Sequence, residues 1–297
     1  MARTKPDTES LQARDAQEPE GDVTPTKDPY WVDALSQGIA VLRAFDTDRA
    51  SLTLSEIGAR LGWSRSKPFR FVHTLEKMGY LTRDETGRAY RLTSLCMQLG
   101  FAYLNRQPLV EMAQPVLDRL RTEVGASVHL ALLEGQELVY VGLSRVQLPT
   151  AISIHVGSRL PAYSTSIGRL LLAYRPQAQL DAFLHGSPLK AWTEKSTIDP
   201  DVLRHKLEAA RQRGYLINDE EFQLGVRSIA APILDGQGDA IAGINATATT
   251  YMFTEERVKS EIIPAVLAAA QEISRNMGYT PERASKARAV AARGRHA

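Results

Sequence analysis

Residues 53–64 of the chain read TLSEIGARLGWS, and this stretch decides the fold of the region around it. Thr53 and Glu56 have the spacing of a capping box, which predicts that a helix begins at Leu54. Leucine and isoleucine then recur at helical spacing, so this short helix has one apolar face. Gly62 follows at the position where a left-handed residue ends a helix.

A second helix is expected to begin after Ser64 or Ser66 and to end at Gly79. Its apolar positions predict a buried stripe of Phe71, Val72, Leu75 and Met78. The cationic, polar and aromatic residues at its start and on its other side, which we expect to face double-stranded DNA, are Arg65, Ser66, Lys67, Phe69, Arg70 and His73. Two short helices joined by a tight turn, the second with cations near its N-terminus, are typical of a helix-turn-helix.

The residues after Gly79 predict a small basic hairpin. Two short alternating segments, 80–83 and 88–92, flank the turn sequence DETG at 84–87, whose glycine tolerates a positive φ. A hairpin at this position is a wing, and we expect Arg83, Arg88 and Arg91 to reach phosphates or a minor groove. The alternative interpretation is an ordinary helical subdomain with a solvated basic face.

Composition limits the class of protein. The chain has 297 residues, of which 43% are hydrophobic and 24% are charged, so it is long enough for two globular domains. Its single cysteine, Cys96, excludes an internal disulfide and a cysteine-cluster metal site. We find no apolar run long enough to cross a membrane and no signal-peptide pattern, so we expect a cytoplasmic chain.

Five parts are predicted along the chain. They are a disordered acidic tail (1–28), a winged helix-turn-helix (29–93), a pair of linker helices (94–125), an effector-binding domain (126–279) and a basic disordered tail (280–297). The winged domain should begin with a helix whose inward stripe is Val32, Leu35, Ile39, Leu42 and Phe45. The basic tail either adds nonspecific DNA affinity or is simply a solvated end.

From residue 127 the hydrophobic period changes to two. Strands are predicted at 128–133, 138–143, 151–155, 215–218, 228–233 and 240–247, and residues 157–161 are predicted as a loop. Helices are predicted at 167–173, 178–184, 201–213 and 254–277. Strands joined mostly by hairpins, with helices between some of them, predict an α+β fold with a mainly antiparallel sheet.

These residues resemble the IclR family of bacterial transcriptional regulators. The resemblance covers roughly residues 32–279 and rests on ordered blocks: LEKMGY at 75–80, GSRLP at 157–161, STSIGR at 164–169, DEEF at 219–222 and GVRSIAAP at 225–232. Residues 144–161 look most like the branch that controls catabolism of protocatechuate and 4-hydroxybenzoate. The resemblance implies a GAF-like C-terminal domain that binds a small organic or aromatic acid. It also implies homodimers, paired into homotetramers, on palindromic operators.

Pro68 departs from the family pattern, which has a small or β-branched residue at this position. Proline lacks the backbone N–H and disfavours the helical conformation at Lys67, but it is tolerated in a first helical turn. We therefore expect the recognition helix to start near Ser66, with Ser66 as its cap. This start leaves open whether Arg65 contacts a base, a phosphate or neither.

The helix expected after Ser164, Thr165 and Ser166 has free N–H groups at its positive end, which suits a carboxylate. The residues that match the family's pocket motif are Ser166, Ile167, Asn218 and Ser228. The family commonly has a carboxylate and a thiol at the last two positions. Asn and Ser both donate and accept, which suits a phenol or a carboxylate.

Arg145 is the candidate for the effector's acid group, because a guanidinium pairs with a carboxylate through two hydrogen bonds. A surface salt bridge is the alternative for this residue. Ser164 and Thr165 also fit plain helix capping. Tyr163, His129 and His155 either line the effector site or only pack.

Enzymatic chemistry is excluded by what the chain lacks. It has no G-x-S-x-G elbow, no P-loop and no H-E-x-x-H, and its six histidines show no metal-ligand pairing, so we expect no catalytic residue, metal or cofactor.

An effector-controlled DNA-binding regulator is the leading hypothesis. The alternatives are a small-molecule sensor whose helix-turn-helix is a protein-interaction module, and a hydrolase. Steep salt dependence of binding distinguishes a phosphate contact from an apolar protein interface.

Overall fold

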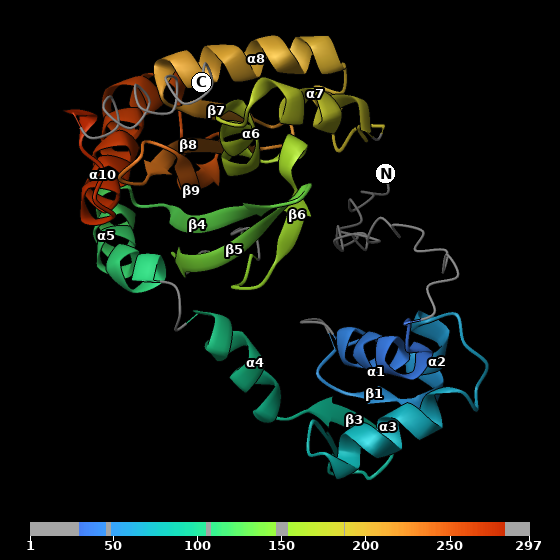
Figure 1. Cartoon of the computed structure of the whole chain (residues 1–297). Coiled ribbons are helices and arrows are strands. Elements are labelled where there is room, and N and C mark those ends of the chain that lie inside the picture. Colours follow the sequence, from blue (N-terminus) through green and yellow to red (C-terminus); the bar gives the residue numbers. More distant parts are fainter. Residues whose placement is uncertain (1–29, 46–48, 105–107, 147–153, 187, 283–297) are drawn as a thin grey trace, which may run out of the picture. The chain divides into compact units, whose positions relative to one another are not determined.

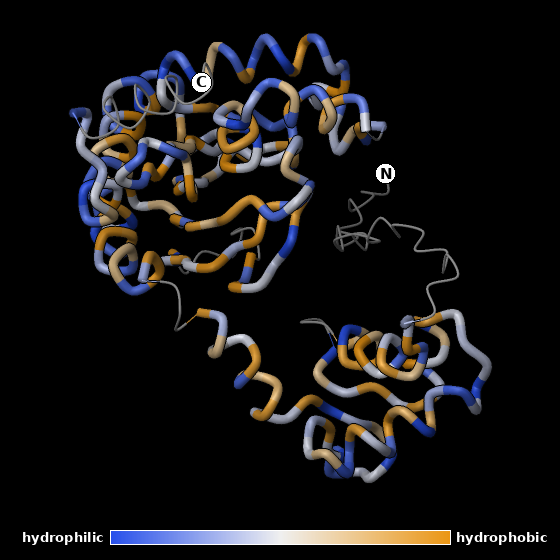
Figure 2. Tube along the Cα trace, in the orientation of Figure 1, coloured by the Kyte–Doolittle hydropathy of each residue, from blue (hydrophilic) through white to orange (hydrophobic). Residues whose placement is uncertain are grey.

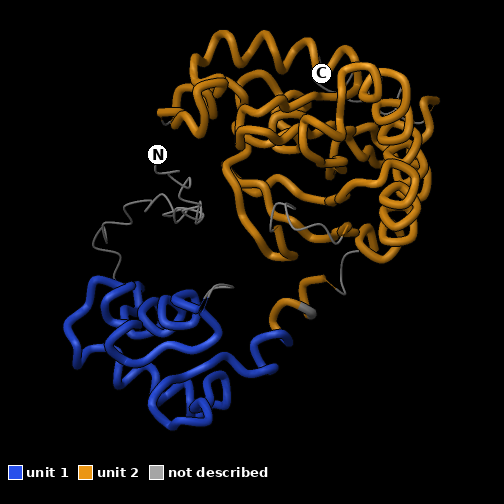
Figure 3. Tube along the Cα trace, turned by 180° about the vertical axis from the view of Figure 1, so that it is seen from behind, with its two compact units in different colours: residues 1–98 blue, residues 99–297 orange. Residues whose placement is uncertain are grey.

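The computed structural model describes residues 30–45, 49–104, 108–146, 154–186 and 188–282. The chain separates into two compact units, residues 1–98 and residues 99–297 (Figure 3). The boundary falls inside α4 (Leu95–Leu104), so this helix belongs in part to each unit. Each unit has a hydrophobic core of its own.

Unit 1 combines helices with a small antiparallel sheet. Its elements are α1 (Asp33–Arg43), β1 (Leu52–Thr53), α2 (Leu54–Arg60), α3 (Pro68–Lys77), β2 (Leu81–Arg83) and β3 (Ala89–Leu92), and the strand order is β1-β3-β2. The capping box predicted at the start of α2 is confirmed. Thr53 N donates to Oε2 of Glu56 at 2.8 Å, and Glu56 N donates to Oγ1 of Thr53 at 3.3 Å.

Both predicted helix ends in the helix-turn-helix are confirmed. Gly62 and Gly79 have φ angles of 62° and 83°, the left-handed conformation that follows the last turn of a helix. The helix pair α2–α3 and the hairpin β2–β3 therefore form the winged helix-turn-helix expected from the sequence.

The core of unit 1 corrects two of the predicted stripes. Its buried residues include Val41, Leu52, Ile57, Val72, Leu75, Leu81 and Tyr90. Met78 is 57% exposed, because it is the cap residue after α3 rather than part of its inner face. In the stripe predicted for α1 and its ends, Val32, Leu35 and Ile39 are exposed, whereas Leu42 and Phe45 pack against the core as predicted. Val41 and Ala44, which were not in that stripe, are buried. Helical spacing marks an apolar face, but only the last turns of α1 reach the core.

Unit 2 is built around a six-stranded sheet with the order β6-β5-β4-β9-β8-β7, and each neighbouring pair is antiparallel. The α+β class with an antiparallel sheet is therefore confirmed. The elements in chain order are α5 (Pro108–Val124), β4 (Ser127–Glu134), β5 (Glu137–Ser144), β6 (Arg159–Pro161), a 3₁₀ turn (Ala162–Ser164), α6 (Ser166–Ala173), α7 (Gln177–Gly186), α8 (Pro200–Arg213), β7 (Leu216–Asp219), β8 (Val226–Leu234), β9 (Ala240–Thr249), α9 (Glu255–Arg257), a π turn (Val258–Ile262) and α10 (Ile263–Asn276).

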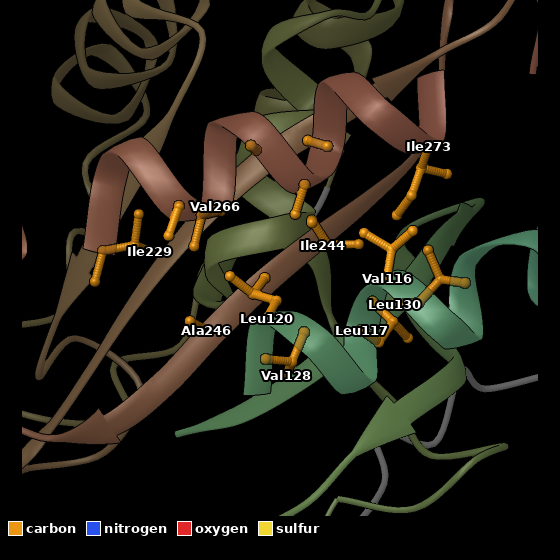
Figure 4. Close-up of a cluster of buried hydrophobic side chains, with 14 of the residues drawn as sticks. Val116, Leu117, Leu120, Val128, Leu130, Ile229, Ile244, Ala246, Val266 and Ile273 are labelled. Carbon is orange, nitrogen blue, oxygen red and sulfur yellow. The ribbon is translucent and has the colours of Figure 1, made fainter. Parts of the chain in front are cut away.

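The two faces of this sheet carry different helices. α5 and α10 pack on one face (Figure 1), where Leu130, Ile229 and Ile244 of the strands meet Leu120 and Val266 of the helices (Figure 4). α6 packs on the other face, and α8 packs on α6. Figure 2 shows that α8 is mainly hydrophilic, as expected for an outer helix.

Three segments differ from expectation or lie outside the described residues. The second of the two linker helices predicted within 94–125 is α5, and it lies in the core of unit 2 because Val116, Leu117 and Leu120 are buried against the sheet (Figure 4). The loop predicted at 157–161 contains the short strand β6, which pairs with β5. The strand predicted at 151–155 falls largely outside the described residues, and Ile154 and His155 are not in a strand.

Candidate functional site

The exposed surface of α3 and of the turn before it carries the predicted DNA-contact residues. Arg65, Ser66, Lys67, Phe69, Arg70 and His73 are all exposed. The rings of Phe69 and His73 stack at 5.9 Å, and Lys67 Nζ lies 4.6 Å from the centroid of the Trp63 ring. Within the described residues, the side chains of Arg65 and Arg70 form no ion pair or hydrogen bond, so both are available to a polyanion.

The start of α3 corrects the prediction that Ser66 caps it. The helix begins at Pro68, Lys67 is its N-cap in a helical conformation (φ −63°, ψ −40°), and no side chain caps it. Pro68 is buried, and a Cβ added at Gly58 of α2 would lie 3.3 Å from its Cγ. The proline ring therefore packs where Gly58 leaves room, and Arg65 and Ser66 lie in the turn before the helix.

Two arginines of the wing, Arg83 and Arg88, differ in their contacts. Arg83 is engaged inside unit 1: its Nε donates to Oε1 of Glu76 at 3.0 Å, its Nη1 donates to the Gly87 carbonyl at 3.1 Å, and it lies over the Tyr90 ring. Arg88 is exposed, and its side chain has no partner within the described part of the chain. Arg88 is thus the better placed of the two for a phosphate.

In unit 2, a row of buried polar residues crosses four neighbouring strands. Strand register places Ser127 of β4 opposite Thr247 of β9, Thr247 opposite Ser228 of β8, and Ser228 opposite Asn218 of β7. These four residues are between 4% and 9% exposed. They lie on the sheet face that carries α6, because the residues next to them along each strand belong to the core on the opposite face. We call these four residues the polar row.

The start of α6 is attached directly to the polar row. Asn218 Nδ2 donates to the Ser164 carbonyl at 2.8 Å. The Thr165 hydroxyl accepts from Gly168 N at 3.2 Å, so the predicted cap at Thr165 is confirmed, and the Ser164 hydroxyl donates to the Pro161 carbonyl at 2.9 Å. The structure thus brings together Ser164, Thr165, Ser166, Ile167, Asn218 and Ser228.

Tyr163 and Arg145 sit at the border of this group. The Tyr163 hydroxyl donates to the Lys190 carbonyl at 3.1 Å and accepts from Lys190 N at 3.0 Å and from Nε1 of Trp192 at 3.2 Å, so it holds the segment 190–192. Arg145 is exposed, and its guanidinium donates to the Ile154 carbonyl.

Sequence reasoning missed Asn245, Thr247 and Ser127. Asn245 Nδ2 donates to the Ser166 hydroxyl at 2.9 Å, and its Oδ1 lies 2.9 Å from Nδ1 of His129. The available signal was the alternation of β9, in which polar residues 245 and 247 interrupt an apolar strand at a period of two. His129 is 1% exposed and therefore lies within this polar group rather than at the surface.

A hollow of about 650 Å³ lies elsewhere, between α8 and β7, and none of the predicted effector residues lines it. Its floor is an ion network: Arg169 Nη1 lies 2.8 Å from Oε2 of Glu221, and Lys206 Nζ lies 3.2 Å from Oε1 of the same carboxylate. Burial alone would raise the pKa of Glu221, but Arg169, the Thr197 hydroxyl and Lys206 hold it below its usual value. Two cations thus hold one carboxylate in place, so we interpret the network as structural. Among the described residues, no cluster of three or more His, Cys, Asp or Glu is suited to hold a metal ion.

Family models match both units. The model of the bacterial transcriptional regulator IclR C-terminal domain matches residues 101–275, and the model of the IclR helix-turn-helix domain matches residues 34–85. The chain belongs to the IclR family of bacterial transcriptional regulators. No described helix of this IclR-family chain has the length and apolar character needed to cross a membrane.

Relatives of this IclR-family chain include regulators of the predicted branch. The Pca regulon regulatory protein of Pseudomonas putida is 36% identical over 249 residues, which are 84% of this chain and 85% of that protein. The p-hydroxybenzoate hydroxylase transcriptional activator of Acinetobacter baylyi is 30% identical over 250 residues, 82% of this chain and 91% of that protein. These relatives are transcriptional regulators, so the prediction that the chain is not an enzyme is confirmed.

Solved structures agree with the fold. The IclR of Thermotoga maritima superimposes with a TM-score of 0.70 at 28% identity, over 82% of this chain and 98% of that chain. An IclR homologue of Microbacterium hydrocarbonoxydans complexed with 4-hydroxybenzoate superimposes with a TM-score of 0.71 at 26% identity, over the same shares of the two chains.

Proposed function

We propose that this IclR-family regulator is a cytoplasmic protein that binds an aromatic acid between the polar row and the start of α6, and that the acid controls its binding to DNA. The observation that carries the proposal is the buried alignment of Ser127, Thr247, Ser228 and Asn218 beside the N-terminus of α6. Buried hydroxyls and amides on one face supply both donors and acceptors, which an apolar core does not need.

The acid group of the effector is assigned to the α6 side of this site. Backbone N–H groups and the positive end of the helix dipole favour a carboxylate at a helix N-terminus. Arg145 is the proposed second partner, since releasing its bond to the Ile154 carbonyl would free its guanidinium for a carboxylate. The homologue from Microbacterium hydrocarbonoxydans, crystallised with 4-hydroxybenzoate, supports an aromatic acid. The Pca regulon regulatory protein and the p-hydroxybenzoate hydroxylase activator among the relatives support control of aromatic-compound catabolism.

The DNA partner is proposed to be a palindromic operator bound by a homodimer that pairs into a tetramer. α3 enters a major groove, and Phe69, Arg70 and His73 on its exposed side reach the bases. α4 supplies a surface for pairing, because its side chains Met97, Leu99 and Tyr103 are exposed and apolar or aromatic. An acid changes the affinity of the regulator for DNA only if the acid binds the DNA-bound and the DNA-free conformations with different affinities.

The test is fluorescence anisotropy of the full chain on DNA from upstream of its own gene, with and without 4-hydroxybenzoate. We expect Arg70→Ala to weaken DNA binding and leave binding of 4-hydroxybenzoate unchanged, and Ser228→Leu to do the reverse. Lys77→Ala, at the exposed far end of α3, is the matched control and should change neither. Equal loss of both activities in Arg70→Ala and Ser228→Leu would contradict two separate sites.

Pairing through α4 is tested by sedimentation velocity on the full chain. Leu99→Glu places a charge on the exposed apolar surface, so we expect the assembly to become smaller at the same protein concentration. Gln98→Glu, also exposed and next to it in sequence, should leave the assembly unchanged. An unchanged sedimentation coefficient in Leu99→Glu would contradict this role of α4.

A further inference from the structure

His129 is a buried imidazole whose surroundings determine which ring nitrogen carries the proton. Its Nδ1 lies 2.9 Å from Oδ1 of Asn245. Nδ2 of the same amide donates to the Ser166 hydroxyl at 2.9 Å, so the amide turns its oxygen toward the imidazole. A carboxamide oxygen only accepts hydrogen bonds, and Nδ1 of His129 is therefore the protonated nitrogen.

The other ring nitrogen, Nε2, is then a hydrogen-bond acceptor. Burial lowers the pKa of His129 to about 4; the bond to Asn245 opposes this shift, and the charge of Arg145 adds to it, so the ring is neutral at physiological pH. Within the described part of the chain, no group donates to Nε2, and the Tyr140 ring only meets the imidazole edge-on at 5.7 Å. Among the described residues, no fully buried side-chain nitrogen or oxygen lacks a hydrogen-bond partner, so Nε2 is not sealed from solvent and is open to a ligand that supplies a donor.

We propose that Nε2 of His129 accepts a hydrogen bond from a hydroxyl group of the effector and that His129 thereby selects hydroxylated aromatic acids. Asn245 is the positioning residue, because it holds the imidazole in the required tautomer. The inference rests on the proposed function and concerns the same site, two residues along β4 from Ser127 of the polar row.

The polarity of the site is then complementary to a hydroxybenzoate. The α6 end and Arg145 present donors, which suit the carboxylate, whereas His129 presents an acceptor, which suits the hydroxyl. A methoxy group in place of the hydroxyl has no proton to donate, and an unsubstituted ring leaves Nε2 without a partner. Sites that hydrogen-bond a ligand hydroxyl discriminate strongly against ligands that lack it.

The first experiment is isothermal titration calorimetry of the full chain with benzoate, 3- and 4-hydroxybenzoate, and 3- and 4-methoxybenzoate. We expect the better-bound hydroxybenzoate to bind at least tenfold more tightly than benzoate and than its own methoxy counterpart. His129→Phe should reduce both ratios to below threefold, whereas His129→Gln, which keeps an amide acceptor near the position of Nε2, should retain most of the selectivity. His205→Phe is the matched control, because the His205 side chain is 80% exposed, and its ratios should equal those of the wild type.

Selectivity that survives in His129→Phe would overturn the inference and leave the proposed function intact. If the wild type bound none of the five acids, the aromatic effector class would fail, and the assignment of its hydroxyl to His129 would fail with it.

The second experiment does not depend on any ligand. Long-range ¹H–¹⁵N correlation spectra of the full chain labelled at histidine distinguish the tautomers, and His129→Gln assigns the His129 signals among those of the six histidines. We expect His129 to be neutral with its proton on Nδ1 at pH 7, and Asn245→Leu to give a mixture of tautomers. A proton on Nε2, or a charged ring at pH 7, would overturn the inference.

Discussion

Ile167 at the start of α6 rests directly on Gly243 of β9: a Cβ added at Gly243 would lie 2.6 Å from Cγ2 of Ile167. Because Gly243 has no side chain, α6 approaches the sheet closely enough for Ser166 to meet Asn245, the residue two positions further along β9. This contact between a glycine and a branched side chain therefore helps to set how far α6 lies from the sheet, together with the packing of α6 on the neighbouring strands.

We expect Gly243→Ala to destabilise unit 2 by about 2 kcal/mol, the usual effect of overpacking a dense core, and to weaken binding of 4-hydroxybenzoate. The measurement is urea unfolding followed by calorimetric titration. In the double variant Gly243→Ala, Ile167→Ala, the added methyl group meets no Cγ2, so the loss of stability should be smaller than the sum of the two single losses. Strict additivity would show that the two residues do not constrain one another.

The arginines of the wing should differ in their salt dependence. Arg88→Ala should lower the slope of log affinity against log salt by about 1, because one phosphate contact is lost. Arg83→Ala should leave the slope unchanged, since its guanidinium is already engaged by Glu76 and the Gly87 carbonyl. Anisotropy titrations at several salt concentrations measure both slopes. A fall in slope for Arg83→Ala equal to that for Arg88→Ala would show that Arg83 also contacts a phosphate.

His129 should make stability depend on pH. Burial lowers its pKa from 6.5 to about 4, so between these values the unfolded chain binds a proton that the folded chain does not. The contribution of His129 to the free energy of unfolding is therefore complete above pH 6.5 and is lost as the pH falls toward 4. Between pH 7.5 and pH 5 we expect the wild type to lose about 2 kcal/mol more free energy of unfolding than His129→Gln. Urea unfolding of both proteins at the two pH values measures the difference, and equal losses would contradict a neutral buried imidazole.

The ion pair between Arg169 and Glu221 should be important for stability, because Arg169 is 2% and Glu221 is 9% exposed. Arg169→Met leaves a buried carboxylate with only Lys206 as its cationic partner, and we expect a loss of about 3 kcal/mol in urea unfolding. The double variant Arg169→Met, Glu221→Leu removes both charges and should recover part of that loss. A double variant less stable than Arg169→Met would contradict this account.

Local sequence was sufficient to predict most of the helix ends in unit 1. The capping box at Thr53 and Glu56, and the glycines at 62 and 79, act on their own helix ends, so short-range spacing predicted them correctly. The start of α3 was predicted wrongly, because Pro68 is placed by its contact with Gly58 on another helix rather than by its neighbours in sequence.

By itself, the sequence determined the family, the α+β class and most of the order of the elements, because periodicity, caps and ordered motifs are local properties of the chain. Only the tertiary structure decided which strands lie side by side and in what register. His129 and Asn245 are 116 residues apart in sequence, and Asn245 and Ser166 are 79 apart. Their meeting depends on strand pairing and on the depth of α6 over the sheet. Hydrophobic packing across the whole unit sets both, and no local pattern encodes them.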